Sequence, residues 1–224
     1  MIYCNVNFLY ICRNGENEEL RYSIRSVMHF FPDAKIYIFG GKPDWYSGPY
    51  IEIPDIGNKF DNINNCYKAI CNTDIEDFIL MNDDFYIINK PDQIINYHDG
   101  LLEDKAKKHA DIFGLTKYAR VLLDANKKLK KQGIQNPLNY DIHTPMLLNK
   151  EKLSKIIDLS FAPRSMYGNM FVKDSSPMSD VKVYKNTEYI NNTGYFISSE
   201  DNSLKKIIVF LKEKFPNPSI YELF

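Results

Sequence analysis

Two adjacent carboxylates, Asp83 and Asp84, follow Asn82 at the end of an apolar run, residues 78–81 (FILM). The run predicts a buried strand, and ligands of open α/β sheets bind beyond the carboxyl ends of the strands. Neighbouring carboxylates repel each other, so a hard cation such as Mg²⁺ or Mn²⁺ beside them is favourable and can also hold a diphosphate. The alternative interpretation is a strand end rich in turn formers that binds nothing.

Two further side chains suit chemistry at such a site. His143 lies in residues 141–145 (DIHTP), where the proline restricts the residue before it to extended geometry. Its imidazole suits a general base or a metal ligand, and a hydrogen-bonded structural histidine is the alternative. We expect Arg164 in a loop, residues 163–169, where an arginine with few charged neighbours can stabilise charge on a leaving group.

Basic residues gather in two other places. Arg13, Arg21 and Arg25 follow the first predicted strand, and the last two share a helix face because they are four residues apart. Arginine suits phosphate or carboxylate recognition, while ion pairing with the neighbouring glutamates is the alternative. Residues 127–131 (KKLKK) form a basic run on a predicted helix, which indicates either a solvated face or contact with phosphate or nucleic acid.

The elements that would position these side chains begin with strand, helix, strand. Residues 5–12 predict a buried strand, residues 18–31 an amphipathic helix capped by Asn17, and residues 34–39 a second strand. This order is typical of a parallel sheet. Further strands or extended segments are expected at 50–54, 76–81, 85–89, 139–148, 181–184 and 195–197, and helices at 59–71, 112–129, 150–159 and 201–215.

Length allows one large globular domain or two small ones, and the order of the predicted elements favours one α/β domain. The chain has 224 residues, 44% of them hydrophobic and 25% charged, which excludes wholesale disorder, collagen and a small disulfide scaffold. The net charge of −1 means that no overall field attracts the chain to nucleic acid. We expect a single domain over 1–224 with a helical insertion at about 98–135.

Cysteine usage and hydropathy predict the compartment. Cys4, Cys12, Cys66 and Cys71 form no CxxC pair and do not have zinc-site spacing, so we expect free thiols packed as small apolar side chains. No signal peptide and no apolar run long enough to span a membrane is visible. The expectation is a soluble protein in a reducing cytoplasm.

Six segments form a linked set in order and spacing: residues 17–27 (NEELRYSIRSV), 35–39 (KIYIF), 42–45 (KPDW), 78–85 (FILMNDDF), 141–145 and 164–169. Together they resemble the Stealth family of sugar-phosphate transferases, which includes capsular polysaccharide phosphotransferases, and the first four resemble its second conserved region. Residues 141–145, with the histidine, and 164–169 (RSMYGN), with the arginine, resemble the third and fourth conserved regions of that family. The compact chain is similar to phage- and prophage-encoded relatives described as glycosyltransferases.

The resemblance implies a nucleotide-diphospho-sugar transferase domain of the GT-A type, with a central, mostly parallel sheet flanked by helices. It implies a nucleotide-binding half at 1–90 and an acceptor-side half at 91–224. It implies a nucleoside-diphosphate sugar as donor, a hydroxyl acceptor, and Mg²⁺ or Mn²⁺ held by Asp84 with Asp83. Glycosyl and phosphoglycosyl transfer both remain open. Catalytic roles are expected for Asp83, His143 and Arg164, and substrate binding for Arg13, Asn17, Arg21, Arg25, Lys59, Asn62, Asn82 and Asn169.

Other functions fit the same sequence. The acceptor is a glycan, another polymer such as a wall polymer, or a modified DNA base, and the basic run at 127–131 is the candidate for DNA contact. A sugar-nucleotide-binding module without catalysis predicts donor binding without turnover. A purely structural protein predicts no donor binding.

Overall fold

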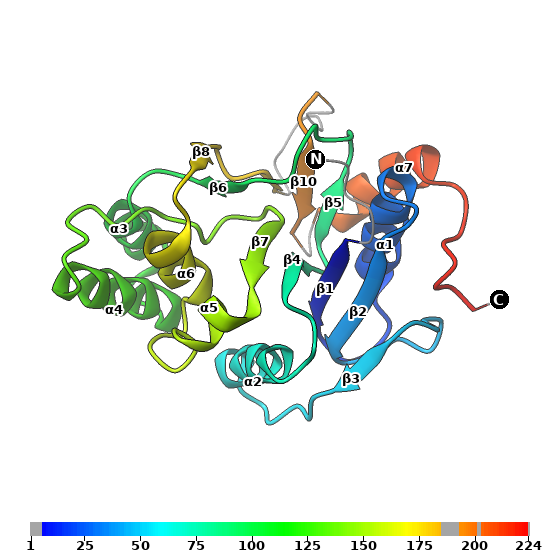
Figure 1. The fold of residues 1–224 in the computed structure, drawn as a ribbon. Helices are drawn as coiled ribbons and strands as arrows, with labels where there is room; N and C mark the ends of the chain where they lie inside the picture. The colour runs from blue at the N-terminus through cyan, green and yellow to red at the C-terminus, as the bar shows by residue number, and fades with distance from the viewer. Residues whose placement is uncertain (1–5, 185–192, 201–202, 224) are drawn as a thin grey trace.

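The computed structural model describes residues 6–184, 193–200 and 203–223 (Figure 1). The strands are β1 (Asn7–Cys12), β2 (Lys35–Gly40), β3 (Tyr50–Glu52), β4 (Asp77–Asn82), β5 (Phe85–Ile87), β6 (Asn96–His98), β7 (Met146–Asn149), β8 (Ser175–Pro177), β9 (Lys182–Val183) and β10 (Phe196–Ser199). The helices are α1 (Glu18–Phe30), α2 (Lys59–Cys71), α3 (Leu102–Phe113), α4 (Lys117–Lys131), α5 (Lys150–Ser154), α6 (Pro163–Phe171) and α7 (Leu204–Lys214).

The central sheet has the strand order β3-β2-β1-β4-β7. The first four strands run parallel, and β7 pairs antiparallel with β4 at one edge. The predicted α/β class with a mainly parallel sheet flanked by helices is therefore confirmed. The chain first winds outward from β1 through β2 to β3 and then returns to place β4 on the other side of β1 (Figure 1).

Both faces of this sheet are covered because its strands are apolar on both sides. On β1, Phe8 and Tyr10 face one core cluster, which contains Leu20, Ile24 and Val27 of α1. The alternate residue of that strand, Leu9, faces the opposite cluster, which includes residues of α2, α4 and α6. Side chains alternate between the faces of a strand, so a run without polar interruptions must be covered twice.

A second, smaller sheet places two C-terminal strands, β9 and β10, beside β5, which follows β4 directly. Its order is β5-β10-β9, with β10 antiparallel to β5 and parallel to β9. The pairing sets Ser198 opposite both Phe85 and Lys182. Residues of α7, among them Ile207 and Leu211, pack against this sheet.

Several predicted elements have the expected bounds. The helix α2 matches its prediction at both ends, and α1 begins after Asn17, whose Oδ1 accepts a hydrogen bond of 3.0 Å from the Leu20 amide. Cys12 and Cys66 are buried free thiols and Cys71 is a half-buried one, as expected, whereas Cys4 lies outside the described residues. Within the described part of the chain, no helix combines the length and the apolar character needed to cross a membrane.

Other predictions were wrong in detail. The helix expected at 112–129 is broken at Gly114, which ends α3 with a φ of 77°, a value that favours glycine. The segment at 139–148 forms a strand only from Met146 onward, and the helix at 150–159 ends at Ser154. Arg164 is not in a loop but in the first turn of α6, directly after Pro163. The last helix, expected at 201–215, is Leu204–Lys214, and residues 201–202 lie outside the described residues.

Candidate functional site

The acidic pair lies where the chain changes its winding direction. Asn82 ends β4 and is paired with Ile11 of β1, so Asp83 and the residue after β1, Arg13, emerge side by side. From β1 the chain adds β2 and β3 on one side of that strand, and it then adds β4 on the other side. Such a switch point is where open α/β sheets form their ligand crevice.

The neighbouring strand ends on the other side of β1 are closed. Gly40 has a φ of +116°, and the Gly41 amide donates a hydrogen bond of 3.0 Å to the Cys12 carbonyl. A Cβ atom at either glycine would overlap the backbone of residues 12–14. This tight contact closes the β2 side of the end of β1, so Arg13 and Asp83 lie on its β4 side.

Asp83 faces the N-terminus of α1. Its Oδ2 accepts a hydrogen bond of 2.6 Å from Asn17 Nδ2 and lies 3.7 Å from Arg13 Nε. Burial, together with repulsion from Asp84, raises the pKa of the Asp83 carboxyl to about 6, against the opposing effect of the Asn17 hydrogen bond. Arg13 also binds Glu19 at 2.9 Å, so one exposed guanidinium serves two carboxylates.

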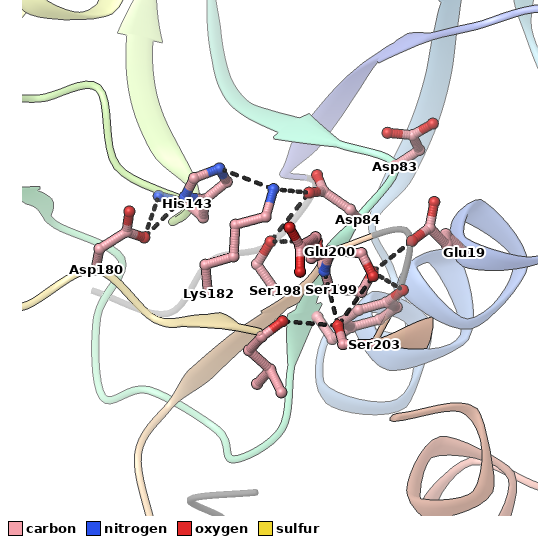
Figure 2. A network of polar contacts seen from close by, with 12 residues as sticks. Glu19, Asp83, Asp84, His143, Asp180, Lys182, Ser198, Ser199, Glu200 and Ser203 are labelled. Atoms are coloured by element: carbon pink, nitrogen blue, oxygen red, sulfur yellow. Dashed lines mark hydrogen bonds and ion pairs between the residues drawn. The ribbon is translucent and has the colours of Figure 1, made fainter. Parts of the chain in front are cut away.

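Asp84 points the other way, as Figure 2 shows. Its Oδ2 accepts a hydrogen bond of 3.0 Å from Ser198 Oγ and lies 3.5 Å from Lys182 Nζ. The two acids expected to act together are therefore divided between two sets of partners. Asp83 belongs to the β1–α1 side, and Asp84 belongs to the side formed by β9 and β10.

His143 completes a row of alternating groups. Its Nδ1 lies 2.8 Å from Asp180 Oδ1, and its Nε2 lies 3.3 Å from Lys182 Nζ (Figure 2). A carboxylate only accepts and an ammonium only donates, so Nδ1 carries the proton and Nε2 presents its lone pair to the cation. We refer to Asp180, His143, Lys182 and Asp84 as the charged row.

Asp180 is held ionised at the end of this row. Burial raises its pKa, but the hydrogen bonds that it accepts from His143 and the charge of Lys105 outweigh burial and hold the pKa well below its ordinary value. Lys105 Nζ lies 3.5 Å from Asp180 Oδ2, the oxygen that His143 does not use. The imidazole is thus oriented by a permanent acceptor.

Arg164 supports the charged row through backbone contacts instead of contacting its side chains. The buried guanidinium donates hydrogen bonds of 3.2, 3.1 and 2.6 Å to the carbonyls of Tyr140, Ile142 and Thr144. These carbonyls flank His143 on both sides. In this structure Arg164 fixes the backbone that carries the imidazole, and it acts on the site through that backbone.

Other expected substrate-binding residues are engaged elsewhere. Arg25 binds Glu222 at 2.6 and 2.8 Å, and Arg21 contacts the same carboxylate at 3.7 Å. Asn62 holds the loop before α2 by accepting from the Ile56 amide at 3.0 Å and donating to Asp55. These contacts do not bring the three side chains to the charged row.

The remaining expected residues separate in the same way. Asn169 binds the amide and the carbonyl of Leu138, each at 2.8 Å, and so closes a loop. Lys59 is exposed at the first position of α2. Of the expected set, Arg13, Asn17, Asn82, Asp83, Asp84 and His143 are the residues that the structure brings to the switch point or the charged row.

Three participants were not predicted, and a fourth, Glu19, was expected only as an ion-pair partner of the neighbouring arginines, which its contact with Arg13 confirms. Asp180, Lys182 and Ser198 come from short segments near the C-terminus, and the buried Glu19 binds Ser199 Oγ at 2.5 Å. The expectation of a strand at 181–184 placed Lys182 correctly in a strand but did not distinguish it from other lysines. Only the folded structure identifies Lys182 as a site residue, because strand pairing places it opposite Ser198.

A cavity of about 370 Å³ lies away from this site. It is lined by Asp77, which begins β4, and by residues of β7 and the end of α6, including Asn149 and Phe171. The acidic pair follows the opposite end of β4, roughly 17 Å along a strand of this length. The cavity and the charged row are separate features.

Known proteins offer structural but not sequence matches. No family model matches the chain, and no curated protein matches it. The structure resembles that of the galactosyltransferase LgtC in complex with donor and acceptor sugar analogs, with 8% identity, a TM-score of 0.42, and coverage of 77% of this chain and 73% of that one. It also resembles the glycosyltransferase GlyE of Streptococcus pneumoniae TIGR4, with 13% identity and a TM-score of 0.40.

The match to GlyE covers 98% of this chain but 66% of that chain, so the present chain spans about two thirds of its length. Both matched proteins are sugar transferases by name, and both similarities are low in sequence identity and in TM-score. The function proposed below therefore rests on the side chains of this chain.

Proposed function

We propose that the chain is a nucleotide-sugar-dependent transferase that moves a sugar, or a sugar phosphate, from a nucleoside diphosphate to a hydroxyl acceptor. The observation that carries the proposal is the meeting of the charged row with Arg13 and Asp83 beside the switch point of a parallel sheet. A crevice of this kind binds nucleotides. The residues 1–90 would provide its nucleotide-binding half and 91–224 its acceptor-side half.

The donor diphosphate would lie between the ends of β1 and β4. The Arg13 side chain, in the loop directly after β1, is 58% exposed there and can turn its guanidinium to a phosphate. Asn82 ends β4 at the same position and would offer its side-chain amide to the donor. Asn17 is buried and its amide already binds Leu20 and Asp83, so its task here is to hold the Asp83 carboxylate. Arg21 and Arg25 are outside this proposal because Arg25 binds Glu222 and Arg21 lies 3.1 Å from Glu18 and 3.7 Å from Glu222.

The resemblance implies a divalent cation, and the described residues fit one. Asp84 and His143 present an oxygen and a lone pair to a single position, and a cation, the Lys182 ammonium, already contacts both. A carboxylate that orients the other ring nitrogen, as Asp180 does, commonly accompanies a metal-binding histidine. The expected partnership of Asp84 with Asp83 is thereby revised to Asp84 with His143.

Two protein ligands are a suitable number for this reaction. Among the described residues, no group of three His, Cys, Asp or Glu side chains converges on one position. Mg²⁺ at phosphate-transfer sites is held by one or two protein groups together with substrate phosphates and water. Bound Mg²⁺ or Mn²⁺ would neutralise the charge that develops on the departing phosphate.

The chain's own residues then have distinct tasks. Asp180 holds the imidazole in the orientation that presents Nε2, and Arg164 holds the backbone on either side of it. Asp83, whose raised pKa reflects burial beside a second acid, would accept hydrogen bonds from donor hydroxyls. Arg13 would add positive charge to the phosphates.

The structure does not favour DNA as the acceptor over a glycan or another polymer. The basic run at 127–131 lies at the end of α4, where Lys128 binds Asp124 at 2.6 Å and Lys130 binds Glu103 at 2.6 Å. Half of the run is thus neutralised by acids of the chain itself. A solvated helix face accounts for it.

The test is turnover of a panel of nucleotide sugars with Mn²⁺, read by chromatography of the released nucleotide. Glycosyl transfer releases a nucleoside diphosphate, and sugar-phosphate transfer releases a nucleoside monophosphate. We expect Asp84→Asn to lower the rate about 1,000-fold, the upper range for one electrostatic group. Asp77→Asn, the same change at the other end of β4, should retain full activity. Equal activity of both variants, or binding of donors without turnover by the unaltered chain, would contradict the proposal.

A further inference from the structure

We propose that Lys182 is an internal counter-ion that occupies the cation position of the site while no donor is bound and is displaced when a divalent cation and a diphosphate enter. This inference rests on the proposed function, because it names the residue that fills the proposed cation position before a metal ion binds. Its basis is that one ammonium contacts both Asp84 Oδ2, at 3.5 Å, and His143 Nε2, at 3.3 Å.

The ammonium and a divalent cation cannot share this position. Both are drawn to the same oxygen and the same lone pair, and like charges at contact distance repel strongly in a partly buried site. Figure 2 shows the Lys182 side chain extending from β9 until its tip lies between the two groups. Metal binding without donor must therefore break both contacts of Lys182, which weakens the apparent affinity for the metal.

The backbone of Lys182 is fixed, so the displaced part is its side chain. β9 pairs with β10, and Ser203 Oγ donates a hydrogen bond of 2.7 Å to the carbonyl of Val183. The four-carbon stem of lysine is flexible and carries a compact charge. The Lys182 contacts, at 3.3 and 3.5 Å, are also longer than the 2.6 Å contact of the Arg25–Glu222 pair. Longer contacts are consistent with an ammonium that a divalent cation displaces.

The two groups that Lys182 contacts keep their positions without it. His143 is held through Nδ1 by Asp180 at 2.8 Å, and Asp84 is held by Ser198 at 3.0 Å. Removing the ammonium therefore leaves a formed pair of ligands with an unfilled cation position. Once released, the ammonium remains beside the gap in which the donor diphosphate would lie, where phosphate oxygens offer it new partners.

The experiment measures Mn²⁺ binding to the donor-free protein by electron paramagnetic resonance of the free ion. We expect Lys182→Met to bind Mn²⁺ at least 10-fold more tightly than the unaltered chain. Lys182→Arg, which keeps the charge, should bind as weakly as the unaltered chain. Lys68→Met is the matched control, since it removes one positive charge from an exposed pair with Asp158 and should change nothing.

A second arm adds UDP, GDP, CDP or ADP in turn. A diphosphate offers the displaced ammonium a partner, so a bound nucleotide should strengthen Mn²⁺ binding of the unaltered chain more than that of Lys182→Met. Thermal unfolding in a chelator checks that each variant is folded, and Lys182→Gln replaces the Met variant if that one is not.

The outcomes separate this inference from the proposed function. Equal or weaker Mn²⁺ binding by folded Lys182→Met and Lys182→Gln overturns the inference, even if nucleotide sugars are turned over. Tighter binding by those variants supports it, and absence of turnover with every nucleotide sugar would then overturn the proposed function alone.

Discussion

Two groups of charged side chains in this molecule differ in how fully contacts within the chain satisfy their charges. The pair Arg25–Glu222 joins α1 to the C-terminal segment by two contacts of 2.6 and 2.8 Å, and its side chains are only 10% and 2% exposed. Its guanidinium also donates to the carbonyls of Phe215 and Pro216, and the Ser219 amide donates to the Glu222 carboxylate. Each charge in this pair is satisfied by the chain.

The charged row becomes looser along its length. Asp180 and His143 are 2.8 Å apart, while Lys182 is 3.3 Å from the imidazole and 3.5 Å from Asp84. The first contact orients a side chain, and the last two hold a cation that another cation can replace. The comparison separates a pair whose charges the chain itself satisfies, which we assign a structural role, from a row with longer contacts, where we propose that a ligand binds.

Replacement of Arg164 is expected to have the largest effect on stability among the changes considered. Arg164→Met leaves the buried carbonyls of Tyr140, Ile142 and Thr144 without their donor, and at about 1–3 kcal/mol for each such group we expect a loss of about 4 kcal/mol of unfolding free energy. Urea unfolding measures the loss. Arg164→Lys should not restore stability, because one ammonium cannot match the planar guanidinium, and full rescue by lysine would contradict this role.

Breaking the closed pair should affect stability alone. Glu222→Gln leaves the Arg25 charge buried without a carboxylate, which costs about 3 kcal/mol. Calorimetric unfolding at neutral pH measures this cost, and turnover per folded molecule should be unchanged. A loss of turnover without a loss of stability would show that the pair belongs to the site.

The same variant also gives a pH dependence. Burial raises the pKa of Glu222, but hydrogen bonds from Arg25 and Ser219 outweigh burial and lower it below the ordinary 4.5. A carboxyl whose pKa is lowered by folding stabilises above its unfolded pKa and loses that contribution as pH falls through the folded value. The stability difference between the unaltered chain and Glu222→Gln should therefore shrink below pH 4.5 and be constant above it.

The tight end of the charged row can be tested with a smaller change. Asp180→Asn removes the charge that orients the imidazole, and such partners typically contribute 10–100-fold, so we expect metal affinity to fall about 30-fold. Titration with Mn²⁺ and UDP measures the affinity. Asp158→Asn, which alters an exposed pair with Lys68, is the matched control. Unchanged Mn²⁺ affinity in Asp180→Asn would mean that His143 is not a ligand.

The sequence predicts those parts of the fold and site that local patterns determine. The cap at Asn17, the bounds of α2 and the acids after β4 follow from neighbouring residues, and the structure contains each of them. The helical position of Arg164 also had a local signal, because Pro163 favours the first position of a helix.

The rest depends on contacts between distant segments. Lys182 belongs to a strand of two residues, too short for any periodicity, and its partners are 39 and 98 positions away at His143 and Asp84. The acid that pairs with Arg25 is 197 positions away, so the neighbouring glutamates were the wrong alternative partners for that residue. Only the pairing of β5, β10 and β9 reveals which lysine lies at the site.

The most direct test of the central claim is anomalous diffraction from crystals of the unaltered chain grown with Mn²⁺ and a nucleoside diphosphate that it binds. The account predicts one manganese peak between Asp84 Oδ2 and His143 Nε2, in contact with the diphosphate, with the Lys182 ammonium moved away from both. A peak on Asp83 with the Lys182 contacts intact, or a diphosphate bound elsewhere on the molecule, would contradict it.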